Sequence, residues 1–467
     1  MDFAFHLDPA AAEPLYLQIA QRLRDAVASG TLKPGARLPA ARVLASQLSL
    51  ARGTVDAAYA VLAGEGALQT RRGSAGTVIS PDMRARPDQP LQPALSLERP
   101  AQPEEPVRPF RLGLPALDAF PRKTWTALTV QVARARHGEA LAYPDPAGLA
   151  ELRQAIAAYL GVARGIRCPA DRVVITAGFQ GALALTRQVL LKPGDAVWVE
   201  DPGFPPARLA LESAGLRLVP IRVDRHGMRV AAGRIAAPRA RLALTTPAHQ
   251  SPLGVALSLP RRLDLLAWAE EAQAWILEDD YDGEFHYAAR PLPSLKSLDR
   301  ADRVIYCGSF SKTLHPGLRL GYVVPPTDLV PAFIRASRLL TGGMPPLEQA
   351  VLARFMEKGL FVRHLRRMRT LYGARRQALS QALAQAMPGG YRVEAEPGGL
   401  HLLLRTPDGA DDTLLAHKAQ AHGLAVTALS SLVIAHDPGR ALLLGFTNVA
   451  EQDAPALAER LAAALTG

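Results

Sequence analysis

The sequence contains little cysteine and no long apolar run. Its two cysteines, Cys168 and Cys307, cannot form a disulfide framework and do not stand in a metal-ligand spacing. No apolar stretch is long enough to cross a membrane, so we expect no membrane partner. The acidic start at Met1-Asp2-Phe3 lacks the basic region of a secretory signal. These absences predict a cytoplasmic protein that holds no metal.

What the chain does have is enough apolar residues for a large core, together with an excess of positive charge. Hydrophobic residues make up 48% and charged residues 21% of the 467 positions, which is typical of a globular chain with two or three domains. The formal net charge is +11, which is compatible with binding to a polyanion. Many basic proteins never contact nucleic acid, so charge alone does not decide the partner.

Residues 1–80 have the pattern of a winged helix-turn-helix domain. Apolar residues recur at helical spacing in three stretches. They are Leu15, Ile19, Leu23 and Val27, then Val43, Leu44 and Leu48, then Val55, Ala58, Tyr59 and Leu62. Ser49-Leu50 leaves only a tight connection between the second and third stretches, which is typical of a helix-turn-helix. Two short strands, at 67–70 and 76–79, around a basic tip that contains glycine predict a wing.

Positive charge gathers in the same region. Residues 30–80 hold six basic and two acidic residues, a local net charge of +4. Arg52 and Thr54 open the third expected helix, where a recognition helix meets base edges in the major groove. The expected DNA contacts are Arg42, Arg52, Gly53, Thr54 and, at the tip of the wing, Arg72 and Gly73. The alternative is a small helical domain for protein contacts.

Four motifs in this region carry a family resemblance. They read Pro14-Leu15-Tyr16-x-Gln18-Ile19, Gly30-x-Leu32-x-Pro34-Gly35-x-Arg37-Leu38-Pro39, Arg52-x-Thr54-Val55 and Tyr59-x-x-Leu62-x-x-Glu65-Gly66. The region therefore resembles the GntR-type winged helix of bacterial regulators, which implies double-stranded operator DNA as a partner. Ala40 and Ala51 stand where the pattern usually has serine, and each removes a hydroxyl that could cap a helix.

Residues 81–109 have a different composition. Prolines are frequent, apolar periodicity is absent, and the charges are mixed with glutamine. Such a stretch is typical of a linker that is semi-rigid where prolines cluster. We expect it to join the first domain to an effector domain over residues 110–467.

From Phe110 onward, apolar runs alternate with helical stretches, which predicts an α/β fold. Seven runs have the pattern of strands: Val173–Thr176, Ala196–Glu200, Leu216–Ile221, Leu242–Thr245, Trp275–Asp280, Val304–Cys307 and Gly321–Val324. This spacing favours a mostly parallel seven-stranded sheet with helices on both faces, which binds ligands at the carboxyl ends of its strands. Residues 346–467, with part of 110–145, are expected to form a smaller α+β part.

The chain is organised around Gly308-Ser309-Phe310-Ser311-Lys312, followed by Arg319. The stretch comes directly after an expected buried strand. An amine at the end of a strand can form a Schiff base with an aldehyde cofactor, while Ser309, Ser311 and Arg319 can hold a phosphate on that cofactor. The alternative is a surface lysine in a polar loop.

A second polar group, Glu278-Asp279-Asp280-Tyr281-Asp282, ends another expected strand. Alternation along a strand places Asp279 and Tyr281 on one face. Asp279 can then keep a pyridine nitrogen protonated, and Tyr281 can reach a phenolic oxygen. Acidic strand ends also bind Mg²⁺, but the lysine motif of a phosphate-binding loop does not accompany this one.

Three further strand ends carry candidate cofactor contacts. Thr176-Ala177-Gly178-Phe179 opens a helix whose N-terminus favours an anion. Phe204 follows Glu200-Asp201-Pro202-Gly203 and could stack on an aromatic ring, although a core phenylalanine is the simpler interpretation. His249 or Gln250 could bond to a cofactor oxygen, and the proline and glycine around them are otherwise typical of an ordinary turn.

Together with Tyr143-x-Asp145-Pro146-x-Gly148-x-x-x-Leu152-Arg153, these clusters resemble the fold-type I aminotransferases that use pyridoxal 5′-phosphate. The resemblance implies Lys312 as the Schiff-base lysine, Asp279 as the pyridinium partner and Tyr281 as the partner of the phenolate. It implies Phe204 as the stacking ring. The phosphate would be held by the backbone at Ala177, Gly178 and Phe179 together with Ser309, Ser311 and Arg319. Tyr143 would reach the site of the partner subunit, which implies a homodimer.

A winged helix joined through a linker to this fold is similar to the MocR family of regulators. Two positions depart from the aminotransferase pattern. Leu442-Leu443-Leu444 stand where an arginine that binds a substrate carboxylate often precedes Gly445-Phe446, and Phe204 replaces a common tyrosine. These departures leave the cofactor residues in place and predict no efficient physiological turnover, with at most a residual half-reaction.

We therefore expect a transcriptional regulator that senses a small amino compound, or pyridoxal phosphate itself, through Lys312. One alternative is an active aminotransferase with an accessory DNA-binding domain, which predicts steady transamination. Another is a DNA-binding protein with a cofactor-free second domain, which predicts no visible chromophore.

Overall fold

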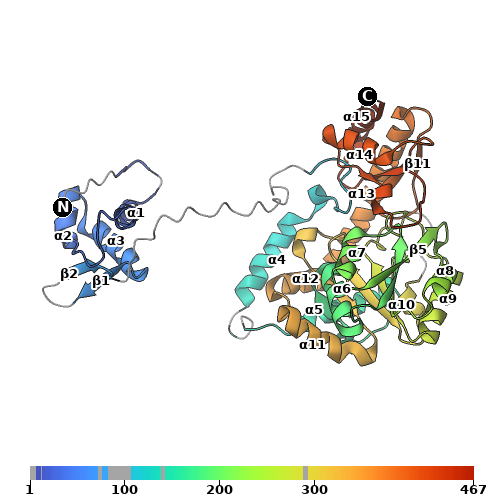
Figure 1. Cartoon of the computed structure of the whole chain (residues 1–467), viewed down its shortest axis with the longest axis horizontal. Helices are drawn as coiled ribbons and strands as arrows, with labels where there is room; N and C mark the ends of the chain where they lie inside the picture. The colour runs from blue at the N-terminus through green and yellow to red at the C-terminus, as the bar shows by residue number, and fades with distance from the viewer. Residues whose placement is uncertain are drawn as a thin grey trace. The chain divides into compact units, whose positions relative to one another are not determined.

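The computed structural model describes residues 7–11, 13–71, 76–81, 107–136, 138, 142–287 and 293–466. The chain divides into two compact units, Met1–Glu105 and Pro106–Gly467. Figure 1 shows the helices and strands of both units, with many of them labelled. The expected linker, residues 81–109, lies for the most part outside the described residues.

The first unit contains three helices and a two-stranded antiparallel sheet. Its elements are α1 (Leu15–Ala28), α2 (Ala41–Leu48), α3 (Arg52–Gly64), β1 (Leu68–Arg71) and β2 (Gly76–Ile79). Ile19, Val55, Leu62 and Ile79 are fully or almost fully buried between them. The three helices and the two strands of the wing are as the sequence predicts, except that Val43 faces solvent with 47% of its surface exposed.

The turn between α2 and α3 is tight. Ser49 adopts a left-handed conformation (φ 56°), and the Leu50 N–H donates to the Ala45 carbonyl at 2.9 Å. Ala40 and Ala51 occupy the N-cap positions of α2 and α3, and neither helix start receives a side-chain hydrogen bond. The helix-turn-helix therefore forms without the hydroxyl caps that serine would supply.

The second unit is built on an eight-stranded sheet. The strands are β3 (Val174–Thr176), β4 (Ala196–Asp201), β5 (Arg217–Asp224), β6 (Gly227–Met228), β7 (Leu242–Thr245), β8 (Trp275–Asp280), β9 (Val304–Ser309) and β10 (Gly321–Val324). Their order is β3-β10-β9-β8-β7-β4-β5-β6. Strands β9, β8, β7, β4 and β5 run parallel, and β10 is antiparallel to both of its neighbours. The seven expected strands are present, and the two-residue β6 adds an antiparallel edge.

Helices cover both faces of this sheet. One face packs against α6 (Gly178–Leu190), α7 (Pro205–Glu212) and α11 (Val330–Thr341). The other face packs against α5 (Ala150–Ala163), α8 (Val230–Ala236), α9 (Leu259–Glu271) and α10 (Leu295–Leu298). Trp198 on β4 stacks on Trp268 of α9, with ring centroids 3.8 Å apart. Strands buried on both faces explain the near-continuous apolar runs in the sequence.

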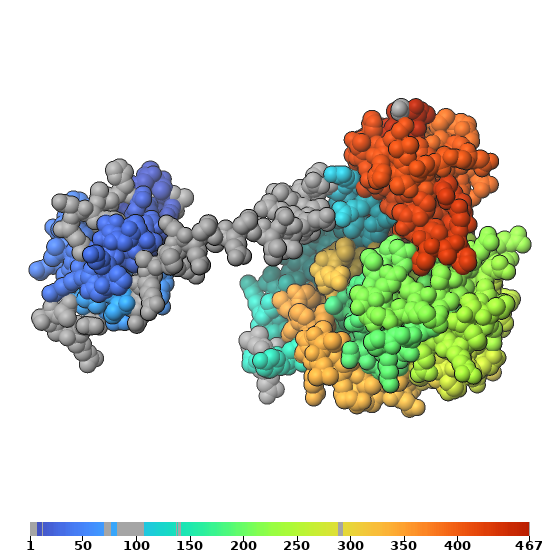
Figure 2. Space-filling view, in the orientation of Figure 1, coloured from blue at the N-terminus to red at the C-terminus, as the bar shows by residue number. Residues whose placement is uncertain are grey.

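Most of the chain from residue 360 onward forms the smaller part, whose last elements are drawn in red in Figures 1 and 2. Its antiparallel sheet has the order β11-β12-β14-β13 and consists of β11 (Arg392–Glu394), β12 (His401–Arg405), β14 (Ala441–Gly445) and β13 (Thr427–Ala428). Its helices are α13 (Leu360–Ala386), α14 (Asp412–Ala421) and α15 (Ala454–Thr466). In the larger part, α12 (Pro346–Glu357) packs against both α5 and α4 (Arg122–Ala135). The smaller part is therefore α+β, as the sequence predicts.

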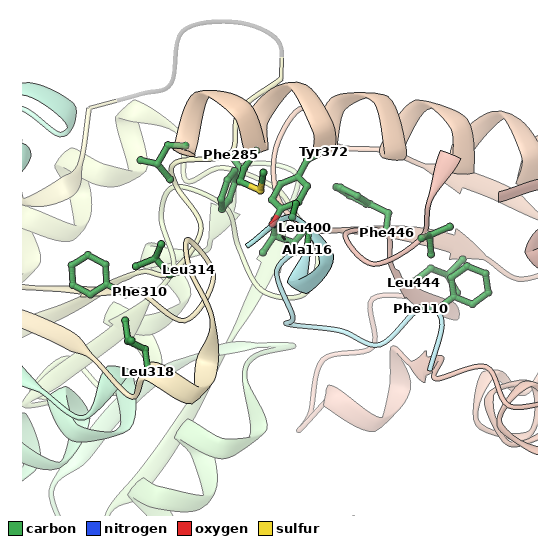
Figure 3. Packing of buried hydrophobic residues seen from close by; sticks show 14 of the residues in the cluster. Phe110, Ala116, Phe285, Phe310, Leu314, Leu318, Tyr372, Leu400, Leu444 and Phe446 are labelled. Carbon is green, nitrogen blue, oxygen red and sulfur yellow. Dashed lines mark hydrogen bonds between the residues drawn. The ribbon is translucent and has the colours of Figure 1, made fainter. Parts of the chain in front are cut away.

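One apolar core joins the two parts. Figure 3 shows Tyr372 on α13 among Phe285, Leu400 and Phe446. The Tyr372 hydroxyl accepts a hydrogen bond from the Ala116 N–H at 2.8 Å, so the aromatic ring is buried with its polar end satisfied. The segment before α4 is thereby fixed against the long helix of the smaller part.

Short 3₁₀ turns complete the described structure. They lie at Leu117–Ala119, Ala170–Arg172, Pro316–Leu318, Thr327–Leu329, Ser430–Leu432 and Glu451–Asp453. Among the helices described, none is both long and apolar enough to cross a membrane.

Candidate cofactor site

The candidate site lies where the carboxyl ends of the strands meet. The loops after β3, β4, β7, β8 and β9 open onto one cavity of about 420 Å³, because these strands share one direction. The predicted residues in its wall are Phe179, Phe204, Asp279, Tyr281, Ser309, Ser311, Lys312 and Arg319. The structure therefore brings together eight residues from four loops that are far apart in the sequence.

Lys312 follows β9 by three residues and points into the cavity. Its Nζ donates to the Gly113 carbonyl at 2.5 Å. Burial lowers the pKa of the Lys312 amine, although the carboxyls of Asp282 and Asp279 act in the opposite direction. A larger neutral fraction makes an amine a better nucleophile toward an aldehyde.

Asp279 offers a carboxyl group to the same cavity. It is 6% exposed, and its Oδ1 atom has no hydrogen-bond partner among the described residues. Burial and the neighbouring Asp280 and Asp282 raise the pKa of Asp279 well above its usual value. A buried carboxyl oxygen without a partner has a strong need for a donor, and a protonated ring nitrogen is such a donor. The position thus fits a pyridinium ring.

The phosphate end is formed where α6 begins beside Arg319. Gly178 has a left-handed backbone (φ 67°), and a Cβ placed there would lie 4.0 Å from both Ser311 Oγ and Arg319 Nη1. Arg319 itself is left-handed (φ 50°), and its Nη2 donates to the Ala177 carbonyl at 3.2 Å. The Ser311 N–H donates to Ser309 Oγ at 3.2 Å. A helix N-terminus, two hydroxyls and a guanidinium around a space left by glycine suit a phosphate.

Two aromatic rings border the cavity on the side of β4. Phe204 occupies the N-cap position of α7, and its side chain is 45% exposed. The ring centroids of Phe204 and Phe179 lie 6.1 Å apart, and the two ring planes make an angle of 65°. Phe204 is therefore not a core phenylalanine, and its ring can cover a flat cofactor.

Tyr281 is held by two residues behind it. Its hydroxyl lies 2.9 Å from His249 Nδ1, and the same nitrogen is 3.0 Å from Asp282 Oδ2. Burial, and then the charge of Asp282, raise the pKa of Tyr281 well above its usual value. His249 is 3% exposed and stands behind Tyr281 rather than in the cavity wall, so its contact with a cofactor would be indirect.

Several site residues carry no signal in the sequence. The Gly113 carbonyl meets Lys312 across 199 positions, and His401 enters the wall from β12. The Asp201 carboxylate accepts three backbone N–H bonds from Ile434, Ala435 and His436 at 2.7–2.8 Å and ties the end of β4 to the smaller part. These contacts depend on packing between distant segments, and no local motif marks them.

Glu200 supports the loop after β7. It is buried and accepts hydrogen bonds from the Thr245 and Thr246 hydroxyls at 2.7 and 2.6 Å. Burial raises the pKa of Glu200, while the hydrogen bonds from both threonines act in the opposite direction. Thr246 lines the cavity, so Glu200 positions one of its walls.

Tyr143, expected at a partner subunit, is fully exposed in the single chain.

In the first unit, the expected DNA contacts Arg42, Arg52 and Gly53 are exposed and Thr54 is partly buried. Arg52 forms an ion pair with Asp56 one helical turn later at 3.2 Å. Arg72 and Gly73 lie outside the described residues. In the part of the chain that the structure describes, no group of three or more acidic, histidine or cysteine side chains suits a metal ion.

The fold and the cavity together define a pyridoxal-phosphate-binding domain of the aminotransferase class, and the first unit is a winged helix. Family models agree: residues 116–461 match "Aminotransferase class I and II", and residues 15–79 match "Bacterial regulatory proteins, gntR family".

Curated relatives match nearly the whole length of this chain. The probable rhizopine catabolism regulatory protein MocR of Rhizobium meliloti is 35% identical over 95% of this chain and 92% of its own length. The pyridoxine biosynthesis transcriptional regulator PdxR of Corynebacterium glutamicum is 33% identical over 92% of this chain and 91% of its own. The chain belongs to the MocR-type transcriptional regulators of the GntR family.

Solved structures resemble the second unit. Kynurenine aminotransferase of Pyrococcus horikoshii covers 76% of this chain with a TM-score of 0.70 and 30% identity, and 90% of its own chain is matched. The multiple substrate aminotransferase of Thermococcus profundus covers 78%, with a TM-score of 0.70, 31% identity and 92% of its own chain matched. The fold and the family imply pyridoxal 5′-phosphate as the cofactor, and the residues around the cavity fit it.

Proposed function

We propose that this regulator senses a small amino compound through a Schiff base at Lys312 and that occupancy of the site changes how its winged helices bind operator DNA. The observation that carries the proposal is that one cavity is lined by a partly buried lysine with a lowered pKa and by Asp279, whose buried Oδ1 has no hydrogen-bond partner among the described residues. The cofactor, when bound, supplies an aldehyde carbon that accepts an amine.

The residues of the chain have distinct tasks at this site. Lys312 would provide the amine that attaches the cofactor, whose aldehyde would supply the carbon for that bond. Asp279 holds the ring nitrogen and its proton. The start of α6, the two serines and Arg319 bind the phosphate. Phe204 covers the ring, and Tyr281 presents its hydroxyl to the phenolic oxygen.

An incoming amine competes with Lys312 for the same carbon. An amine bound in this way would take the place of the Lys312 amine, which would then be free in the cavity. Lys312 then regains freedom next to Gly113, and the segment 110–116 connects this point to α13. A ligand that favours one arrangement of these parts biases the DNA-binding state by its difference in affinity.

A second candidate signal is pyridoxal phosphate itself. The name of PdxR, a relative, refers to pyridoxine biosynthesis. Binding of pyridoxal phosphate alone would order the same residues.

For either signal we infer a homodimer, because Tyr143 is a large, fully exposed side chain close to the loop of Asp145 and Pro146. An active aminotransferase is disfavoured, because Leu443 stands in the cavity wall.

The test is chemical labelling of the full-length protein. Borohydride reduction of the protein loaded with pyridoxal phosphate should attach the cofactor to Lys312, as read by peptide mass spectrometry. Lys312→Ala should lose that label, whereas Lys296→Ala, which removes a lysine outside the cavity, should keep it. A label on another residue, or an equal label in the Lys312→Ala variant, would refute the assignment.

A further inference from the structure

Beyond the cofactor residues, the cavity has an apolar wall. Leu112, Leu400, Leu432 and Leu443 line it, and Leu443 is fully buried. Leu112 and Leu432 pack on the cluster that contains Leu443. These residues come from the segment after Phe110 and from the smaller part, whereas Asp279 lies on β8 and Lys312 in the loop after β9.

The positive groups in the cavity wall are already assigned. Among the described residues that line it, the lysine and arginine side chains are Lys312, which attaches the cofactor, and Arg319, which sits at its phosphate. His401 also lines the cavity, but burial lowers its pKa to about 4, and its Nε2 lies 2.7 Å from the Pro252 carbonyl. At neutral pH, His401 therefore carries no charge.

One further guanidinium lies nearby. Arg208 on α7 lines an adjoining cavity of about 30 Å³, and Arg208 is not among the described residues that line the main cavity. The two cavities share eight lining residues, among them Phe204, Asp279 and Leu432. Leu400 and Leu443 line only the main cavity, so a carboxylate held against these two leucines would lose its water without gaining a cation, which is costly.

We infer that the effector is an amine with an uncharged, apolar body and no carboxylate next to its nitrogen. This inference rests on the proposed function and names the class of compound that the site takes. The amine nitrogen replaces Lys312 at the aldehyde carbon, while the apolar body packs on Leu400, Leu432 and Leu443. An α-amino acid of the same shape is rejected by the cost of burying its carboxylate.

The experiment compares 3-methylbutylamine with L-leucine, which differ only by the carboxylate. Full-length protein loaded with pyridoxal phosphate is titrated with each compound and then reduced with borohydride. Mass spectrometry measures the fraction of chains that keep the cofactor on Lys312, since a displaced lysine is not labelled. We expect the amine to reach half displacement at a concentration at least about tenfold lower than leucine, a difference of 1.4 kcal/mol.

Two variants sharpen the comparison. Leu443→Arg introduces a cation into the wall and should reverse or abolish the preference for the amine, whereas Leu443→Met, of similar size but neutral, should keep it. Because Leu443 is buried and the arginine variant can fail to fold, the comparison on the unmodified protein stands alone. Arg208→Gln should leave the preference unchanged.

The outcomes separate this inference from the function on which it rests. Equal or tighter displacement by leucine overturns the inference while Lys312 labelling without ligand still supports the proposed function. Loss of the leucine response in Arg208→Gln also overturns it, since Arg208 would then bind the carboxylate. If Lys312 is never labelled, the proposed function fails first.

Discussion

At the scale of single residues, the account depends on Asp279. Its Oδ1 is buried without a partner among the described residues, and burial, then the neighbouring Asp280 and Asp282, raise the pKa of Asp279. A cationic ring nitrogen relieves this arrangement, because the charge opposes the repulsion and the N–H supplies the missing donor.

Replacing Asp279 by asparagine should weaken the binding of pyridoxal phosphate by about 1.5–3 kcal/mol, because a charge-assisted hydrogen bond is lost. Equilibrium dialysis of the full-length variant measures this. Asp282→Asn removes the same charge from a residue that contacts His249 outside the cavity wall and should have a smaller effect. Equal losses of affinity in both variants would mean that Asp279 acts only through the electrostatic effect of its negative charge and not through a hydrogen bond to the cofactor.

His401 should make the second unit sensitive to acid. Burial, then the neighbouring His249, lower its pKa from 6.5 to about 4, while the bond to Pro252 and the charge of Asp282 act in the opposite direction. Between pH 6.5 and 4 the unfolded chain binds more protons at this position, so the free energy of unfolding falls as the pH falls.

We expect the unmodified protein to lose about 1–2 kcal/mol more than His401→Gln between pH 6.5 and 4.5, a value reduced for the partial exposure of the ring. Urea unfolding followed by tryptophan fluorescence suits the test, because all four tryptophans, 125, 198, 268 and 275, belong to the second unit. Parallel pH profiles of the two proteins would contradict the prediction.

At the scale of elements, the recognition helix α3 begins without a side-chain cap. Ala51→Ser should stabilise α3 by about 1 kcal/mol, because the hydroxyl can accept a hydrogen bond from a free N–H of the first turn. Hydrogen exchange of α3 amides in the full-length protein should slow about fivefold. Ala60→Ser, on the exposed face of the same helix, should not slow exchange. If both serines act alike, capping is not the cause.

Arg52 at the start of α3 should read a base. Arg52→Ala is expected to weaken binding to a duplex selected from a random pool by the unmodified protein by about 1–3 kcal/mol. Little of this comes from the exposed pair with Asp56. Arg22→Ala, an exposed residue of α1, is the matched control for charge. Binding should also become less selective at one base pair, and an equal, sequence-independent loss in both variants would contradict base reading.

Most of the helices and strands could be predicted from the sequence. The helical spacing of Ile19, Val55 and Leu62 identifies the winged helix, and the apolar runs identify seven strands of the main sheet, because local periodicity records which face is buried. The short β6 was missed, since two residues have no periodicity. Lys312 and Asp279 could be placed at one sheet edge because both end parallel strands.

Other parts of the site could not be predicted. Gly113, His401 and the contact of Asp201 with residues 434–436 arise from segments that meet only after the two parts of the second unit have packed together. The position of His249 behind Tyr281 is likewise a result of tertiary packing. Sequence patterns report local geometry, whereas these contacts depend on the whole core.

At the scale of the whole molecule, the two units are joined by a segment whose boundaries, 81–109, remain a prediction. Each unit has its own apolar core, so each can keep its structure while the other responds to a ligand. Coupling then requires that the occupied and unoccupied second unit place or restrain the winged helices differently. The homodimer that we infer offers such a difference, because two winged helices must match two half-sites.

The most direct test of this coupling is the affinity of the full-length protein for the selected duplex, measured by fluorescence anisotropy in three states: without cofactor, with pyridoxal phosphate, and with pyridoxal phosphate plus 3-methylbutylamine. The account predicts that the apparent Kd differs at least about fivefold between two of these states in the unmodified protein, a coupling of about 1 kcal/mol, and that Lys312→Ala abolishes any difference due to the amine. One Kd in all three states, or the same amine response in Lys312→Ala, would contradict it.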